Sequence, residues 1–154
     1  MNARCVAGID PGLSGAVAFY FVDAPGRVAI YDMPECDGEV NVAALADRIR
    51  QMAPTEAIIE RVWARQNNGV SQAFKFGGAY YSARTVLQLL DIPTTLVTPT
   101  KWKKRFNLAG GKEGKEQARA LAMRTFPASA DHFKRIKDAD RAEAALLAKY
   151  GAEI

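Results

Sequence analysis

Three short apolar segments joined by Pro-Gly turns constrain the fold of this chain more than any other feature of its sequence. The segments cover residues 4–10, 15–23 and 27–33, and the turns are Pro11-Gly12 and Pro25-Gly26. Connections this short join antiparallel neighbours, because a parallel pair needs a crossover of a dozen or more residues. The pattern therefore predicts that the chain begins as an antiparallel sheet of three strands.

Helical and strand-like segments alternate along the rest of the chain. Val42, Leu45, Ile49 and Met52 recur at helical spacing behind Asn41, which we expect to be the N-cap of a helix. Further helices are expected over about 71–90, 115–125 and 139–149, and further strands over 57–63 and 94–97. The basic, glycine-containing stretch 98–115 predicts a mobile loop that starts with a helical turn over 100–106.

This order predicts an α/β fold with a mixed five-stranded sheet, in which three antiparallel strands gain parallel additions and helices cover both faces. With 154 residues, 49% of them hydrophobic, residues 1–154 are expected to form a single domain. Cys5 and Cys36 make neither a disulfide framework nor a metal-binding spacing, and Cys5 is expected in the core. No apolar run approaches the roughly 18 to 20 residues that span a bilayer. We expect a cytoplasmic protein without membrane contact.

Positive charge is concentrated in one part of the chain, although the net charge is only +4. Between Lys101 and Lys137, eleven Lys or Arg stand against three acids, which gives this segment +8 and leaves −4 for the remainder. A solvated surface usually mixes both signs. The segregation favours a contact surface for nucleic acid, with an ordinary charged face as the alternative.

Two acids stand where folding alone gives little reason for them. Asp10 ends an apolar strand before Pro11, and an Asx turn is the alternative explanation for it. Strand alternation places Glu60 on the face of Ile58 and Val62, where an unpaired carboxylate is costly to bury. A metal ion would offset that cost, and so would a basic partner.

Two further acids, Asp140 and Glu143, stand at i and i+3 of the last expected helix, with β-carbons about 5 to 6 Å apart. Taken alone, this spacing favours a capping box, and a shared metal ion is the alternative. Asp138 is the better candidate for the cap and only a reserve ligand. Phosphodiester hydrolysis assisted by two Mg²⁺ ions requires several carboxylates that converge on the ions.

Three segments that contain these acids resemble, in the same order, the acidic motifs of RuvC-type Holliday junction resolvases of the ribonuclease H-like superfamily. They are Gly-Ile-Asp-Pro-Gly at 8–12, Ile-Glu-Arg-Val-Trp at 59–63 and Asp-Arg-Ala-Glu-Ala-Ala-Leu-Leu-Ala at 140–148. The resemblance covers nearly the whole chain and is greatest to the phage and plastid branches. The first motif alone is weakly specific, whereas the ordered set is strong.

The resemblance implies a ribonuclease H-like fold, a homodimer, two Mg²⁺ or Mn²⁺ ions per active site, and paired symmetric nicks across a four-way DNA junction. Carried over by position, the catalytic and metal-binding acids are Asp10, Glu60, Asp140 and Glu143. Many bacterial members have Asp at the place of Glu143, so the coordination by this longer side chain stays open.

Candidate DNA contacts follow the second acidic motif and fill the basic loop. The resemblance implies that Trp63 inserts at the junction, where stacking on a base contributes about 1 to 3 kcal/mol, and a core position is the alternative. Lys104 and Lys115 match family lysines best. The full set is Trp63, Arg65, Lys101, Lys103, Lys104, Arg105, Lys112 and Lys115.

The helix expected over 71–90 is interpreted as the homodimer interface. It carries aromatic residues such as Phe74 and Tyr81 around more than one face, together with the small pair Gly77-Gly78. A helix packed only on its own sheet is the alternative. His132, the only histidine, is interpreted as a surface residue rather than a base or ligand.

Other functions compete with junction resolution. A ribonuclease H-like nuclease that cuts RNA or flap and fork DNA would share the acidic site, which does not choose the substrate. A non-catalytic module that binds branched DNA would keep the basic surface but has no use for four acids. An actin-like sugar kinase would use residues 10–15 as a phosphate loop, but it needs a second domain for which 154 residues leave no room.

Overall fold

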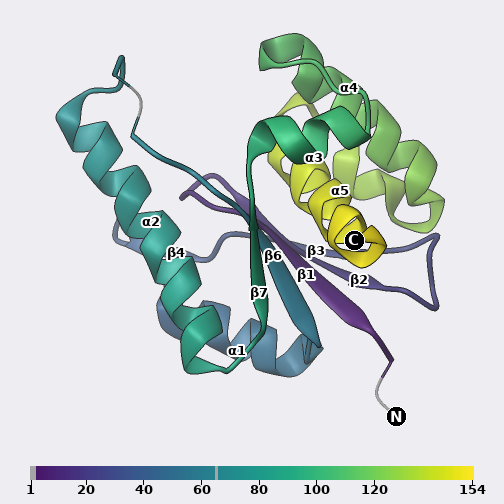
Figure 1. The fold of residues 1–154 in the computed structure, drawn as a ribbon, viewed down its shortest axis with the longest axis horizontal. Helices are drawn as coiled ribbons and strands as arrows, with labels where there is room; N and C mark the ends of the chain where they lie inside the picture. The colour runs from purple at the N-terminus through teal and green to yellow at the C-terminus, as the bar shows by residue number, and fades with distance from the viewer. Residues whose placement is uncertain (1–2, 65) are drawn as a thin grey trace.

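The computed structural model, which describes residues 3–64 and 66–154, is built around one five-stranded sheet in the order β3-β2-β1-β6-β7 (Figure 1). The strands are β1 (Cys5–Asp10), β2 (Ala16–Phe21), β3 (Ala29–Asp32), β6 (Glu56–Glu60) and β7 (Thr94–Val97). The first three strands pair antiparallel, and β6 and β7 add in parallel. The predicted mixed α/β sheet is confirmed.

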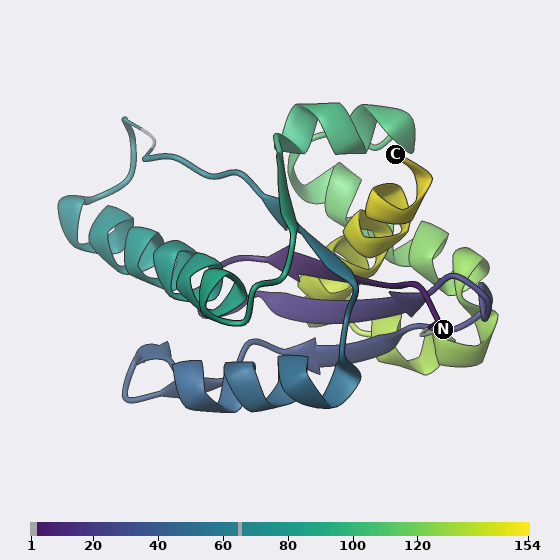
Figure 2. The same cartoon turned by 60° about the horizontal axis from the view of Figure 1, so that its bottom comes forward.

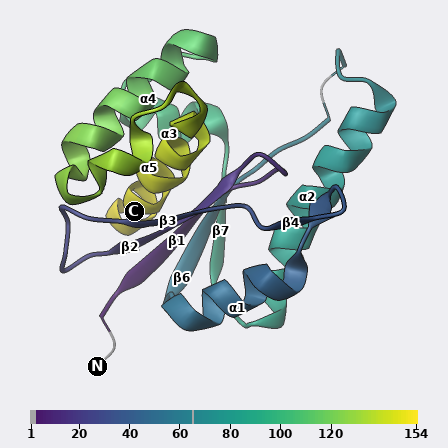
Figure 3. The same ribbon diagram turned by 180° about the vertical axis from the view of Figure 1, so that it is seen from behind.

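Helices cover both faces of this sheet, as predicted (Figures 2 and 3). On one face lie α1 (Val42–Met52) and α2 (Val70–Leu89). On the other lie α3 (Pro99–Arg105), α4 (Gly111–Thr125) and α5 (Ala139–Glu153). The predicted cap of α1 is confirmed, because the Asn41 side chain accepts a hydrogen bond from the backbone N–H of Ala44 at 3.1 Å.

Side-chain alternation in the two central strands decides which helices each residue meets. In β1, Ile9 faces the core beneath α1 and α2, whereas Val6 faces the core beneath α5. In β6, Ile59 faces the core beneath α1 and α2, and Ile58 faces the core beneath α5. Asp10 and Glu60 end these strands on the side of Val6 and Ile58, so both carboxylates point toward α5.

A glycine lets α5 lie directly against β1. A β-carbon on Gly8 would stand 2.4 Å from the backbone oxygen of Ala144 and 2.5 Å from the backbone nitrogen of Ala148, which no side chain could occupy. This close approach brings the first turns of α5 to the end of β1, where Asp10 stands.

Three expectations about element boundaries were wrong. β6 ends at Glu60 rather than at residue 63: the Arg61 N–H still donates to the Val97 carbonyl at 2.7 Å, but the chain leaves the sheet beyond it. The helical turn expected over 100–106 is confirmed as α3, but the loop expected to continue to residue 115 is wrong, since α4 begins at Gly111 and the Gln117 side chain accepts a hydrogen bond from the Ala109 N–H at 2.8 Å. α5 continues to Glu153, past the expected end at residue 149.

Some short elements were not predicted. They are the hairpin β4 (Glu35–Cys36) and β5 (Glu39–Val40), and the 3-10 helices η1 (Pro127–Phe133) and η2 (Ile136–Asp138). Cys5 is buried and His132 is exposed, as expected. In the part of the chain that the structure describes, no helix is both long and apolar enough to cross a membrane.

Candidate metal centre

Three carboxylates from distant parts of the chain meet at the end of β1. Asp10, Asp140 and Glu143 each offer one oxygen, and these oxygens all lie within 4.8 Å of one another. Asp10 is the last residue of β1, and the other two project from the same face of α5 at i and i+3. Glu143 is buried. Oxygen donors at this separation suit a divalent cation such as Mg²⁺.

Glu60 stands beside this cluster on the neighbouring strand. It follows directly after the last registered β1–β6 pair, Ile9 and Ile59, and its charge helps to raise the pKa of Asp10. Its Oε2 accepts a hydrogen bond from the indole N–H of Trp102 at 2.7 Å. The 4.8 Å group found among the described residues contains the other three acids and not Glu60.

Burial and the crowding of negative charge disfavour the ionised forms of Asp10 and Glu60. Burial, followed by the charges of Glu143, Asp140 and Glu60, holds the pKa of Asp10 well above its usual range. Burial also raises the pKa of Glu60, against the lowering effect of the Trp102 hydrogen bond. A bound cation would relieve both effects, so the donor set fits a metal ion.

Two lysines border the acids. The ammonium group of Lys115 lies 3.0 Å from Asp140 Oδ1 and 3.9 Å from Glu143 Oε2, and that of Lys103 lies 3.3 Å from Glu143 Oε1. Burial alone would lower the pKa of Lys115, but Glu143 and Asp140 outweigh it and raise that pKa. Within residues 3–64 and 66–154, no arginine forms an ion pair with these acids. Four carboxylates therefore face two ammonium groups.

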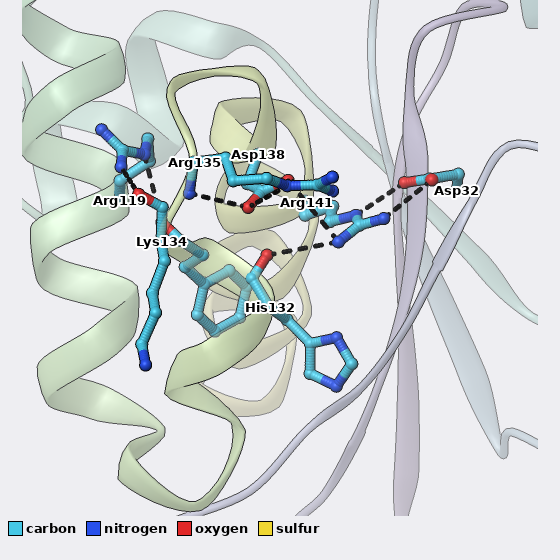
Figure 4. A network of polar contacts seen from close by, with 8 residues as sticks. Asp32, Arg119, His132, Lys134, Arg135, Asp138 and Arg141 are labelled. Atoms are coloured by element: carbon cyan, nitrogen blue, oxygen red, sulfur yellow. Dashed lines mark hydrogen bonds and ion pairs between the residues drawn. The ribbon is translucent and has the colours of Figure 1, made fainter.

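Asp138 occupies the N-cap position of α5, as expected, but its side chain makes no capping hydrogen bond there and instead lies among arginines (Figure 4). It is 1% exposed and accepts hydrogen bonds from the backbone N–H of Arg135 at 2.9 Å and from its guanidinium at 2.8 Å. Arg141 lies 3.5 Å from Asp138 and reaches Asp32 on β3 at 2.7 Å. The expected cap position is confirmed, whereas the reserve-ligand role is wrong, because arginines pair with this carboxylate and it is not part of the acidic group.

The capping-box interpretation of Asp140 and Glu143 is also wrong. The N-cap position of α5 is Asp138, so Asp140 lies inside the first turn. Its carboxylate and that of Glu143 face Asp10 and the two lysines rather than the end of the helix.

Of the predicted DNA contacts of α3 and α4, only Lys103 and Lys115 form ion pairs with the acids among the described residues. Lys101, Lys104 and Lys112 are exposed, whereas Arg105 pairs with Glu153 at 2.9 Å. Lys103 and Lys115 are the two lysines already placed against the acids. Arg65 lies outside the described residues.

Trp63 is 58% exposed and follows the end of β6, so the core interpretation of this residue is wrong. Together with Glu60, Phe76, Asn68 and Gln72 it lines a hollow of about 320 Å³. An exposed aromatic side chain therefore stands next to the acidic site.

Trp102, within the basic stretch 98–115, received no role from the sequence. It is fully buried, and its ring packs edge-on against Phe106 with centroids 6.4 Å apart. The i, i+4 spacing of these two aromatic residues was the available signal for a buried helical face.

No model of a known protein family matches the chain, and no curated protein does. Among solved structures, RuvC from T. thermophilus in complex with a Holliday junction substrate matches with a TM-score of 0.65 and 20% identity over 97% of this chain and 95% of that chain. A second structure of Thermus thermophilus RuvC matches with a TM-score of 0.63 and 20% identity over 97% and 96% of the two chains. The yeast mitochondrial Holliday junction resolvase Ydc2 matches with a TM-score of 0.53 and 14% identity over 96% and 77%. The chain therefore has the ribonuclease H-like α/β fold of RuvC-type resolvases.

Proposed function

We propose that this chain is a metal-dependent endonuclease that resolves four-way DNA junctions by paired symmetric nicks. The observation that carries the proposal is the meeting of Asp10, Asp140 and Glu143, with Glu60 beside them, at one rim of this sheet. One of the matching structures is a RuvC bound to a Holliday junction substrate, which supports the choice of DNA substrate.

The four acids would hold two divalent cations, Mg²⁺ or Mn²⁺. Bound there, the ions would supply activation of a water molecule and stabilisation of the leaving oxygen. The raised pKa of Asp10 supports this role, because the cluster lacks enough positive charge of its own. Lys103 and Lys115 border the acids and would hold the scissile phosphate close to them.

The exposed lysines of α3 and α4 would bind the DNA backbone on one side of the acids. Lys101, Lys104 and Lys112 present their charges to solvent there. Trp63 would stack on a base at the branch point, and the neighbouring hollow has room for an unstacked base. These contacts would select a branched substrate over linear duplex.

A homodimer would place two such sites on two symmetry-related strands, and the exposed face of α2 is its proposed interface. Phe74 is 82% exposed, and Val70 and Tyr81 lie on the same side of the helix. Side chains added at Gly77 or Gly78 would meet nothing within 4 Å, so this stripe is open to a second copy. The opposite face, with Ala83 and Leu87, packs on the sheet. A resolvase of this kind would work in the cytoplasm on nucleoid or phage DNA.

Cleavage of a substrate panel tests the proposal. A four-way junction, a Y-fork, linear duplex and an RNA–DNA hybrid are each incubated with the full chain in Mg²⁺ or EDTA. We expect symmetric paired nicks in the junction, only with Mg²⁺, and loss of junction preference in Trp63→Ala. Cleavage of the hybrid or the fork alone would favour the competing nuclease functions, and junction binding without any cleavage would favour a non-catalytic module.

A further inference from the structure

Trp102 is a buried residue whose single polar side-chain atom, the indole nitrogen, contacts Glu60, one of the candidate catalytic acids. The side chain is fully buried, and its indole N–H lies 2.7 Å from Oε2 of Glu60. An indole has a single donor and no acceptor, and a hydrogen bond to a carboxylate is stronger than one between neutral groups. The tryptophan therefore meets its hydrogen-bonding requirement at Glu60.

The backbone fixes the indole in this place. β7 pairs with β6 up to the register pair Glu60 and Val97, and α3 begins at Pro99 directly beyond it. Trp102 then packs in the core that contains Val97 and lies edge-on to Phe106. The donor is therefore held by packed neighbours rather than by a mobile side chain.

The same helix contacts a second acid of the site. Lys103 pairs with Glu143 at 3.3 Å, and its ammonium lies 5.5 Å from the centre of the Trp102 ring. Two consecutive residues of α3 thus contact acids that come from β6 and α5. Glu60 itself is the last residue of its strand, paired with Val97 of β7.

We propose that Trp102 is a positioning residue for Glu60: its N–H holds Oε2 in one orientation and leaves Oε1 available as a metal ligand. This inference rests on the proposed metal-dependent function. Within the described residues, Oε2 and not Oε1 of Glu60 takes part in a hydrogen bond. Partners of this kind that orient a ligand typically change metal affinity or activity by about 10- to 100-fold when they are removed.

The test is the affinity of the full chain for Mn²⁺, measured by calorimetry without DNA, in the parent and in Trp102→Phe. The phenylalanine keeps an aromatic ring and removes the donor. We expect the Mn²⁺ affinity to fall by about 10- to 100-fold. Junction binding in EDTA should stay unchanged, and kcat should fall with KM preserved.

Phe106→Leu is the matched control, because it disturbs the packing of Trp102 and keeps its N–H. This variant should lower the unfolding temperature without weakening Mn²⁺ binding. If Trp102→Phe does not fold, 3-benzothienylalanine at position 102 keeps the bicyclic shape and replaces the N–H with sulfur, and the same loss of affinity is expected.

The outcomes separate this inference from the proposed function. Junction cleavage by the parent together with unchanged Mn²⁺ affinity in the donor-free variants would overturn the positioning role alone. Weakened Mn²⁺ binding in those variants, with no cleavage of any substrate by the parent, would support the positioning role and overturn the nuclease. A parent chain that binds no Mn²⁺ would overturn both.

Discussion

Asp138 and Asp140 are two residues apart, yet their surroundings are opposite. Asp138 is buried among arginines, and although burial works against it, the hydrogen bonds and charge of Arg135 lower its pKa. Asp140 faces Asp10 and Glu143, and this crowding, together with burial, raises the pKa of Asp10. We call the first group the arginine network (Asp32, Arg135, Asp138 and Arg141) and the second the acid cluster (Asp10, Asp140 and Glu143).

The difference separates charge that the chain neutralises by its own ion pairs from charge for which we propose a bound cation. In the arginine network each carboxylate finds a partner inside the chain, and Arg141 ties the start of α5 to Asp32 on β3. In the acid cluster the chain brings together charges that repel one another and that two lysines only partly balance. Clusters of this kind persist where a ligand supplies the missing charge. The network holds the first turn of α5, the helix that also carries Asp140 and Glu143.

The largest effect is expected for Asp10→Asn, which removes a charge from the acid cluster. Cleavage of a four-way junction should fall roughly 10³-fold, equivalent to about 4 kcal/mol, because a metal ligand is lost. The metal-free chain should become more stable, by about 1 kcal/mol or roughly 2 to 4 °C in melting temperature, because repulsion is relieved. Gel assays and thermal unfolding in EDTA measure the two effects.

Asp23→Asn is the control for this change, because Asp23 is an exposed acid in the β2–β3 turn. It alters the net charge equally and should change neither property. Full cleavage by Asp10→Asn, or a lower melting temperature without metal, would show that the acid cluster is a structural element like the arginine network.

The second effect, of opposite sign, is expected for Asp138→Asn in the arginine network. The charge that Arg135 and Arg141 pair with is lost from a buried position, so the free energy of unfolding should fall by about 2 kcal/mol. Denaturant unfolding measures it. Asp131→Asn breaks a surface ion pair of the same i, i+3 spacing with Lys134 and should have no measurable effect. If Asp138→Asn and Asp131→Asn were equally stable, the arginine network would stabilise the fold no more than a surface ion pair does.

A smaller effect is expected for Lys115→Met, which removes part of the balancing charge of the acid cluster. If Lys115 also contacts a DNA phosphate, the slope of log affinity against log salt for junction binding should decrease by about one unit. Lys134→Met serves as the control, because Lys134 pairs with Asp131 on η1 instead. Unchanged slopes in both variants would show that Lys115 pairs with the acids and contacts no DNA phosphate.

The smallest effect concerns the pH dependence of stability in the metal-free chain. Asp10 and Glu60 have raised pKa values when folded, so the stability they contribute is present at low pH and is lost as the pH rises through those values. Asp138 and Asp32 have lowered pKa values, so their contribution is present above the ordinary value near 4 and is lost as the pH falls through their folded values.

Unfolding curves across pH check this contrast. The stability gain from Asp10→Asn should grow as the pH rises above about 4, and the loss from Asp138→Asn should shrink as the pH falls below it. Parallel pH profiles for the two variants would contradict the assigned pKa directions.

Much of the fold could be predicted because it depends on local signals. Pro11-Gly12 and Pro25-Gly26 mark two hairpin connections, and Asn41 marks the start of α1. The end of β6 at Glu60 and the early start of α4 could not be predicted in this way. The extent of β6 depends on its pairing with β7, which comes later in the chain, and the segment before α4 depends on the Gln117 side chain, which accepts a hydrogen bond from the Ala109 N–H.

The candidate site was predicted as a set of residues but not as an arrangement. The motif resemblance selected Asp10, Asp140 and Glu143, which the fold brings together. The local pattern around the last two favoured a capping box, because sequence spacing does not reveal what lies opposite a helix. The contact of Trp102 with Glu60 was hidden for the same reason, since the two residues are 42 positions apart.

The central claim is that the acid cluster, with Glu60, binds the divalent cations that cleavage requires. The most direct test is anomalous diffraction from crystals of the chain soaked in Mn²⁺, with junction cleavage measured on the same preparation. We predict anomalous peaks in coordination distance of Asp10, Asp140 and Glu143, and their loss in Asp10→Asn. Mn²⁺-dependent cleavage by a chain whose crystals hold no ion at these carboxylates would contradict the account.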